Sequence, residues 1–225
     1  MVGSFFALTE NSTLTRLMLL MGVALTVAAL LSWKSTRRWA VGVAVAAAGI
    51  GLAVVLWPEK KAAPGPLRER YVAALRVYDG VPYVWGGESR RGIDCSGLVR
   101  RGLRDALRAE GLSAGNLPLI RQATANWWRD TSASTMGQGA GGEAVPLGKF
   151  SSVRDVPPDR LVPGDFAITA DGVHALAYLG DGQWIHAAPG NAKVVIVPRD
   201  GTDPWLGRPV TLCRWVCLTG DGATR

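Results

Sequence analysis

The sequence predicts an α+β domain preceded by two apolar helices. Three observations support this fold class: two long uncharged runs near the N-terminus, an amphipathic run that begins at Cys95, and two strand-like segments that carry His174 and His186. Helices and strands that occupy separate blocks of a chain are typical of the α+β class. The 225 residues are enough for one domain of ordinary size with additional segments.

The N-terminal residues 1–58 are expected to form a membrane anchor. The runs Leu17–Trp33 and Trp39–Trp57 carry no charge. At 1.5 Å per residue they would reach roughly 25 to 29 Å, close to the ~30 Å apolar core of a bilayer. Tryptophans at the ends of the runs fit the membrane interface. We therefore expect two transmembrane helices, at about 17–33 and 39–57; a cleaved signal peptide followed by a buried helix is the alternative.

Charge says little about orientation or partners. Basic residues lie both in the link at 34–38 and after the second run at 60–70, so the positive-inside rule gives no clear orientation. The formal net charge of +7 leaves the rest of the chain only mildly basic. No zinc-finger spacing, helix-turn-helix or phosphate-binding glycine loop is recognisable, and nucleic acid is not expected as a partner. The sequence identifies no protein partner.

Composition divides the remaining chain into a linker and a domain. Residues 59–66 are rich in Pro and Ala without apolar periodicity and predict a linker. Residues 67–225 can bury a core of their own. Within them, the Gly- and Ser-rich segment 129–160 exceeds the usual loop length. We interpret it as a loose loop, with a wall or lid of a substrate groove as alternatives.

Cys95 lies where a Gly-bounded loop gives way to a helical pattern. Apolar residues recur at three- and four-residue steps from Cys95 to Leu107, and Asp94 is placed to cap the helix. A thiol on the first turn of a helix is expected to have its pKa lowered from about 8.5 to between roughly 3.5 and 7.5. A packing role for the cysteine is the alternative. The charged residues assigned to the opposite face are Arg100, Arg101, Arg104, Asp105 and Arg108.

The two histidines of the chain lie in neighbouring strand-like runs joined by Gly-Asp-Gly at 180–182. Side chains alternate along a strand, so His174 and His186 share a face only if the loop has an odd number of residues. We therefore expect a three-residue loop that pairs Leu176 with His186. Two adjacent histidines indicate a relay from Cys95 through His174 to His186, or a zinc site with the cysteine as third ligand. The relay is favoured, and neither a metal nor another cofactor is expected.

The remaining cysteines and two tryptophan-containing segments are interpreted as packing residues. Cys213 and Cys217 would share a face of the final strand at a separation too large for a disulfide. The tryptophan pair at 127–128 and the segment DPWLG at 203–207 are assigned to packing in the same way.

Three blocks carry a family resemblance: GVPYVWGGESRRGIDCSGLVRRGLRDAL, VPGDFAI and VHALAYLGDGQWIHAAPG. In this order they resemble the NlpC family of papain-like cell-wall cysteine peptidases, over roughly residues 67–218. The resemblance implies a papain-like α+β fold in which the cysteine helix packs on a small antiparallel sheet. It also implies hydrolysis of amide bonds in peptidoglycan stem peptides, commonly between D-glutamate and a diamino acid, through a thioacyl-enzyme.

The resemblance further implies roles for particular residues. Cys95 would be the nucleophile, His174 the general base and His186 the residue that orients it. Positions that match family residues near the substrate are Tyr83, Asp94 and Ser96. Strand packing is the alternative role for the tyrosine, and helix capping for the other two.

The favoured interpretation is a membrane-anchored peptidase on the outer face of the bacterial cytoplasmic membrane, because polymeric peptidoglycan is found there. The alternatives are a peptidoglycan-binding module that does not cut, a secreted antibacterial effector with the same hydrolase domain, and a cytoplasmic-facing peptidase of soluble muropeptides.

Overall fold

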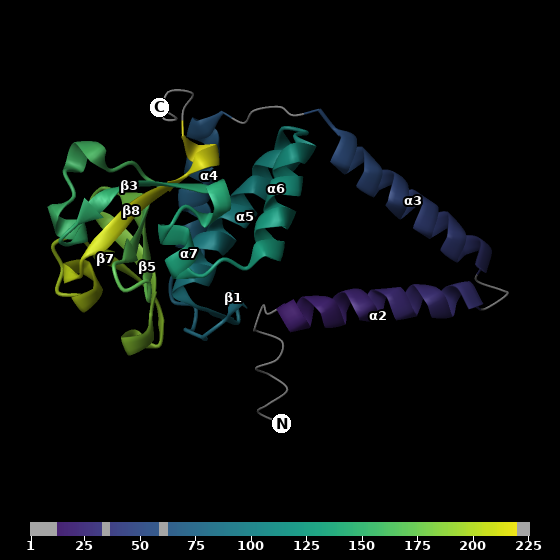
Figure 1. Cartoon of the computed structure of the whole chain (residues 1–225), viewed down its shortest axis with the longest axis horizontal. Helices are drawn as coiled ribbons and strands as arrows, with labels where there is room; N and C mark the ends of the chain where they lie inside the picture. Colours follow the sequence, from purple (N-terminus) through teal and green to yellow (C-terminus); the bar gives the residue numbers. More distant parts are fainter. Residues whose placement is uncertain (1–12, 33–36, 59–62, 220–225) are drawn as a thin grey trace.

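The computed structural model describes residues 13–32, 37–58 and 63–219 (Figure 1). Two long helices, α2 (Thr13–Ser32) and α3 (Arg37–Leu56), extend away from a body in which three helices lie against an antiparallel sheet. The predicted α+β class is confirmed.

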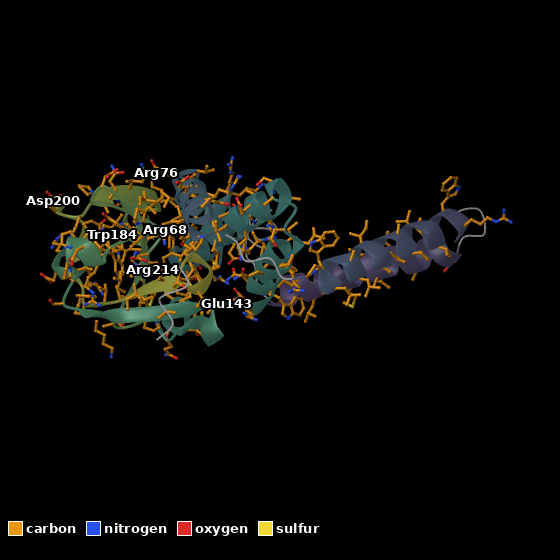
Figure 2. The ribbon with its side chains drawn as sticks, turned by 90° about the horizontal axis from the view of Figure 1, so that it is seen from above. Arg68, Arg76, Glu143, Trp184, Asp200 and Arg214 are labelled. Carbon is orange, nitrogen blue, oxygen red and sulfur yellow. The ribbon has the colours of Figure 1, made fainter. Side chains whose placement is uncertain are left out.

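Many large apolar side chains of α2 and α3 are exposed, and Figure 2 shows them projecting from the two helices. Within the described ranges, no helix is both long enough and apolar enough to cross a bilayer. The predicted pair of transmembrane helices is therefore not confirmed. Residue 33 at the end of the first predicted run, residues 34–36 of the predicted link and residues 59–62 of the predicted linker lie outside the described residues.

The helices of the body are arranged around the cysteine helix. α4 (Pro64–Arg76) and α6 (Leu117–Arg129) both pack against α5 (Cys95–Ser113). Pro64 begins α4, where a missing N–H costs nothing and the fixed φ favours the helix. The buried side of α5 includes Leu98, Val99 and Leu103, in agreement with the helical periodicity of the sequence.

Two arginines assigned to the outer face of α5 are buried instead. Arg100 and Arg104 are 3% and 0% exposed. Arg104 donates from both Nη atoms to Glu88, at 3.1 and 2.8 Å, and Arg100 Nη2 lies 2.6 Å from Glu88 Oε1. Glu88 lies on β1 (Glu88–Ser89), which pairs with β2 (Gly92–Ile93). Burial of a charge is costly unless the charge is paired, and the carboxylate that pairs these arginines lies outside the helix, where helical periodicity gives no sign of it.

One six-stranded sheet forms the other half of the body, in the order β3-β8-β4-β5-β6-β7 with every pair antiparallel. One face packs against the helices. The other face is covered by the segments around Val153 and Leu206, with Trp184 fully buried beneath them (Figure 2). The strands are β3 (Ala144–Phe150), β4 (Phe166–Thr169), β5 (Ala175–Gly180), β6 (Gln183–Ala188), β7 (Lys193–Pro198) and β8 (Val210–Trp215).

Residues 129–160 form ordered elements, so the loose-loop interpretation is wrong. Ser132 caps α7 (Ala133–Gly137) by accepting from the N–H of Thr135, and Ser152 caps η2 (Val153–Asp155) by accepting from that of Arg154. The small polar residues that suggested disorder thus begin short helices. The other elements of the segment are η1 (Ala140–Gly142), the edge strand β3 and η3 (Pro158–Arg160).

The connection between β5 and β6 differs from the predicted three-residue loop. Asp181 and Gly182 form a two-residue turn with φ of 50° and 70°. A register shift between Tyr178 and Gly180 adds one residue to β5. Ala177 still pairs with Ile185, which brings Leu176 opposite His186 as predicted. The loop length was wrong and the register right, because the bulge supplies the residue that the turn lacks.

All three cysteines are free thiols. Cys213 is buried on β8, whereas Cys217 lies in η6 (Val216–Leu218), beyond the end of the strand. The predicted shared strand face is therefore wrong for Cys217, although both residues pack with the core as expected.

Candidate active site

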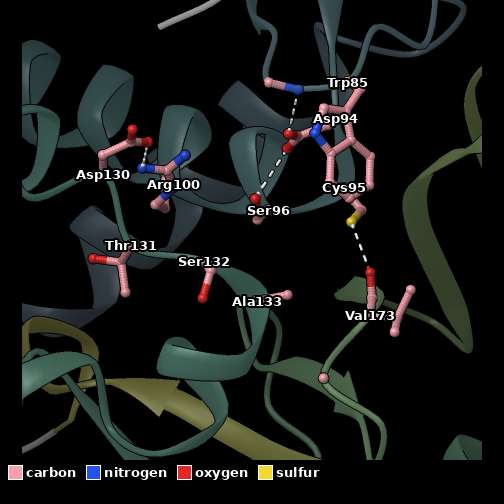
Figure 3. A pocket seen from close by; sticks show the side chains of 12 residues that line it. Trp85, Asp94, Cys95, Ser96, Arg100, Asp130, Thr131, Ser132, Ala133 and Val173 are labelled. Carbon is pink, nitrogen blue, oxygen red and sulfur yellow. Dashed lines mark hydrogen bonds and ion pairs between the residues drawn. The ribbon is translucent and has the colours of Figure 1, made fainter. Parts of the chain in front are cut away.

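Cys95 is the first residue of α5, and the side chain of Asp94 caps this end of the helix. Asp94 Oδ1 accepts from the N–H of Gly97 at 2.6 Å and from the hydroxyl of Ser96 at 3.0 Å, while Oδ2 accepts from the N–H of Gly86 at 2.9 Å (Figure 3). Burial raises the pKa of Asp94, and these hydrogen bonds oppose that shift. The carboxylate thus ties the preceding loop to the first helical turn.

The thiol of Cys95 is buried and donates toward the carbonyl oxygen of Val173, with Sγ and O 3.7 Å apart. Burial, reinforced by the nearby Asp94, raises the pKa of this thiol to about 12. The lowered pKa expected for a helix N-terminus is therefore wrong. Loss of water around the thiolate outweighs the backbone N–H groups that favour it, and the resting thiol is neutral.

The side chains of His174 and His186 are buried and contact each other. Nε2 of His174, just before β5, is 2.9 Å from Nδ1 of His186 in β6, and the two rings are nearly perpendicular. Their exposures are 1% and 0%. Burial first, and then His186, lowers the pKa of His174 to about 3, while burial lowers the pKa of His186 against the influence of Asp203. Both rings are neutral at neutral pH.

The thiol of Cys95 lies near the backbone of the segment that carries His174. The thiol's acceptor, Val173, directly precedes His174 in the chain. Among the described residues, no hydrogen bond joins Cys95 to an imidazole nitrogen. Nε2 of His174 is engaged by His186, and the two rings lie on the sheet face that Trp205 covers. The predicted relay from Cys95 to His174 therefore stays a prediction.

Two residues that the sequence left in a packing role belong to this site. Asp203 Oδ2 lies 3.3 Å from Nε2 of His186, within ion-pair distance although the N–H is not aligned for a hydrogen bond. The ring of Trp205 stacks on His174 with centroids 4.0 Å apart and planes 24° from parallel. Asp203 caps the short helix η5 (Pro204–Gly207). The Asp-Pro pair indicated a helix start, but no sequence pattern linked it to the histidines.

A cleft of about 540 Å³ lies over the cysteine (Figure 3). Cys95, Asp94 and Ser96 line it, whereas Tyr83 and the two histidines are not among its lining residues. The other lining residues are Trp85, Gly86, Arg100, Asp130, Thr131, Ser132, Ala133, Gly172 and Val173. Part of the 129–160 segment is therefore a wall of the cleft, which was one of the predicted alternatives.

Tyr83 lies beside the cleft in an isolated bridge to Ile93. Burial first, and then the nearby titratable thiol of Cys95, raises the pKa of its phenol to about 12. The hydroxyl is thus a neutral group near the thiol. Within the part of the chain that the structure describes, it makes no hydrogen bond.

Two of the residues that line the cleft, Arg100 and Asp130, belong to a group of linked charges. Arg100 Nη1 lies 2.9 Å from Asp130 Oδ1, and Arg16 Nη2 of α2 lies 3.3 Å from the same oxygen. Arg16 also donates to the carbonyl oxygen of Trp128 at 2.6 Å. The N-terminal helix is therefore joined to the cleft wall by a buried side chain.

The helices packed on one antiparallel sheet, with Cys95 at the start of α5, define a papain-like α+β protein. The family model described as the NlpC/P60 family matches residues 80–205, and the chain belongs to this family. Proteins named as probable endopeptidases from Mycobacterium bovis and Mycobacterium tuberculosis are each 32% identical to it over 138 residues, or 61% of the chain. The chain spans 28% of the length of these relatives.

Solved structures with a similar arrangement include the peptidoglycan hydrolase RipB from Mycobacterium tuberculosis. It is 20% identical, with a TM-score of 0.43 and coverage of 82% of this chain and 88% of RipB. NlpC1 from Trichomonas vaginalis is 17% identical, also with a TM-score of 0.43, and the match covers 70% of this chain and 46% of NlpC1.

Proposed function

We propose that this chain is a cysteine peptidase that hydrolyses amide bonds in peptidoglycan stem peptides through a thioacyl-enzyme. The observation that carries the proposal is the position of Cys95, at the first turn of α5 in an open cleft, with its thiol at the carbonyl of the residue that precedes His174. Family membership and the endopeptidase names of the relatives support the reaction class. The peptidoglycan substrate is the one implied by the resemblance of the sequence blocks.

The first step begins from a neutral thiol and a neutral imidazole. The Sγ proton of Cys95 passes to Nδ1 of His174 as sulfur attacks the carbonyl carbon of the scissile amide. Negative charge develops on the carbonyl oxygen. The backbone N–H of Cys95, at the positive end of α5, is placed to stabilise that charge.

The second step releases the two products in turn. The imidazolium of His174 gives its proton to the leaving amine, and the acyl group stays on sulfur. A water molecule then attacks the thioester carbonyl, with His174 accepting its proton, and the thiol is regenerated. His186 holds Nε2 of His174 throughout and keeps the ring in place.

Substrate contacts are assigned to the rim of the cleft. Asp94 and Ser96 would bind a free amine of the stem peptide, because a buried carboxylate and a hydroxyl both offer acceptor lone pairs there. The phenol of Tyr83 would donate to the substrate carbonyl. Polymeric peptidoglycan lies on the outer side of the bacterial cytoplasmic membrane, and we place the active domain on that side.

Digestion of purified peptidoglycan by the full-length chain tests this function, with the muropeptides analysed by mass spectrometry. We expect new fragments with the wild type and none with Cys95→Ala or His174→Ala. Cys217→Ala, a cysteine outside the cleft, is the matched control and should cut. No fragments from a folded wild type under reducing conditions would favour a module that binds peptidoglycan without cutting it.

A further inference from the structure

The carboxylate of Asp203 lies beside His186, on the side of the ring away from His174. Nδ1 of His186 faces His174 at 2.9 Å, and Nε2 of the same ring faces Oδ2 of Asp203 at 3.3 Å. The imidazole of His186 therefore lies between an imidazole and a carboxylate. An ionised carboxylate can only accept hydrogen bonds, so it favours a proton on Nε2 of His186.

The tautomer of His186 determines the tautomer of His174. A neutral imidazole carries one N–H and one acceptor nitrogen. If His186 holds its proton on Nε2, its Nδ1 is an acceptor and His174 must donate from Nε2. Nδ1 of His174 is then the unprotonated nitrogen, as a base toward Cys95 requires. The opposite tautomer of His186 would move the proton of His174 to Nδ1 and remove the base.

The carboxylate of Asp203 is held in this orientation by its own helix. Oδ1 accepts from the N–H of Trp205 at 2.9 Å, which leaves Oδ2 for His186. The ring of Trp205 stacks on His174, and the guanidinium of Arg208 lies 4.4 Å from the centre of the indole. One short segment thus contacts both histidines, one through a carboxylate and the other through a ring face.

We propose that Asp203 is a positioning residue that sets the tautomers of His186 and His174 and so leaves Nδ1 of His174 free to accept the proton of Cys95. The inference rests on the proposed function only for the identity of the base. The other charged groups that act on the pair are Asp171 and Arg208, beside His174, and they form an ion pair with each other at 3.2 Å.

Two substitutions of Asp203 in the full-length chain distinguish its interaction with His186 from its capping of η5, and a third substitution is a control. In Asp203→Asn, Oδ1 can keep its bond to Trp205, which turns the amide NH₂ toward His186 and reverses the tautomer preference. In Asp203→Ser, the hydroxyl can still cap η5 but is too short to take the place of the carboxylate. Asp200→Asn is the matched control, because Asp200 is an exposed acid of the same loop (Figure 2).

The first readout is the nitrogen NMR spectrum of protein labelled at histidine, where the two residues give two ring systems. We expect both rings of the wild type and of Asp200→Asn to carry the proton on Nε2. In Asp203→Asn we expect both to carry it on Nδ1. Unchanged tautomers in a folded Asp203→Asn protein would overturn the proposal.

The second readout is the rate at which iodoacetamide alkylates Cys95, followed by peptide mass spectrometry across pH. We expect Asp203→Asn to slow alkylation by about tenfold or more near neutral pH. The difference should vanish at high pH, where hydroxide removes the thiol proton directly. Asp203→Ser should show a smaller loss. Equal rates for Asp203→Asn and Asp200→Asn would reject the positioning role.

The two proposals fail in different ways. If His174→Ala leaves neutral-pH alkylation unchanged, His174 is not the base and the proposed function is wrong, whatever the tautomers show. If His174→Ala slows alkylation while Asp203→Asn does not, the peptidase mechanism stands and the role of Asp203 is rejected.

Discussion

Arg100 and Glu88 form a buried ion pair with Nη2 and Oε1 2.6 Å apart, and this pair joins the cysteine helix to the β1–β2 hairpin. Arg104 completes the cluster with two further hydrogen bonds to the same carboxylate. The hairpin leads directly into Asp94 and Cys95. The cluster therefore fixes the loop that delivers the thiol to the cleft.

Glu88→Gln should destabilise the protein strongly, because it leaves the buried guanidinium of Arg104 without its countercharge and that of Arg100 with Asp130 alone. We expect the free energy of unfolding to fall by about 3–5 kcal/mol. Urea titration measures the change. The control is Glu69→Gln, an exposed glutamate on α4, which should stay within about 0.5 kcal/mol of the wild type. Equal losses for the two variants would contradict a structural role for the cluster.

Acid should destabilise the fold through the buried histidines. The folded-state pKa of His174, about 3, lies below the ordinary value of 6.5, so unfolding takes up a proton between these limits. The contribution of His174 to the free energy of unfolding is complete above pH 6.5 and is lost as the pH falls toward 3. Between pH 6 and pH 4 we expect a loss of about 2 kcal/mol from this residue. In urea titrations at several pH values, His174→Gln should remove this part of the change in the free energy of unfolding with pH. An unchanged pH dependence would contradict the prediction.

Gly172 lies where the histidine-bearing loop meets α7. Its φ is +72°, and an added Cβ would be 2.8 Å from Cβ of Ser134. We expect Gly172→Ala to cost about 1–3 kcal/mol and to lower peptidoglycan cleavage by shifting Val173 and His174. Gly190→Ala, with no atom near the new Cβ, should leave thermal stability and cleavage almost unchanged. Adding Ser134→Gly to Gly172→Ala should recover part of the loss, since it relieves the contact but not the backbone strain.

Arg16→Ala should loosen α2 from the body. The substitution removes the ion pair to Asp130 and the hydrogen bond to the carbonyl oxygen of Trp128. We expect faster hydrogen exchange in α2 and at the end of α6, measured by mass spectrometry. Arg38→Ala, an exposed arginine of α3, is the control. If both variants exchange alike, Arg16 does not hold the helix.

Local patterns predicted the parts of the site that lie close together in the chain. The capped start of α5 at Cys95 follows from helical periodicity, and the shared face of the two histidines follows from strand alternation. The register survived a wrong loop length because the core requires these strands to keep their faces.

The errors concern contacts between distant segments. The burial of Arg100 depends on Glu88, and the place of Asp203 at His186 depends on how η5 folds over the sheet. The prediction for the thiol pKa of Cys95 was wrong for the same reason. The start of the helix, which lowers the pKa, can be recognised from neighbouring residues, whereas the burial that raises it depends on the whole fold. No periodicity within one element carries such information.

The charges of Glu88, Arg100, Asp130 and Arg16 alternate in sign from β1 to α2. These residues come from four separate parts of the chain, and each forms an ion pair with a residue of opposite charge in this group. Substitutions at neighbouring links should therefore not be additive. A sequence that loses one of these charges is expected to be tolerated only when a second position changes with it, so the N-terminal helix and the rim of the cleft should vary together.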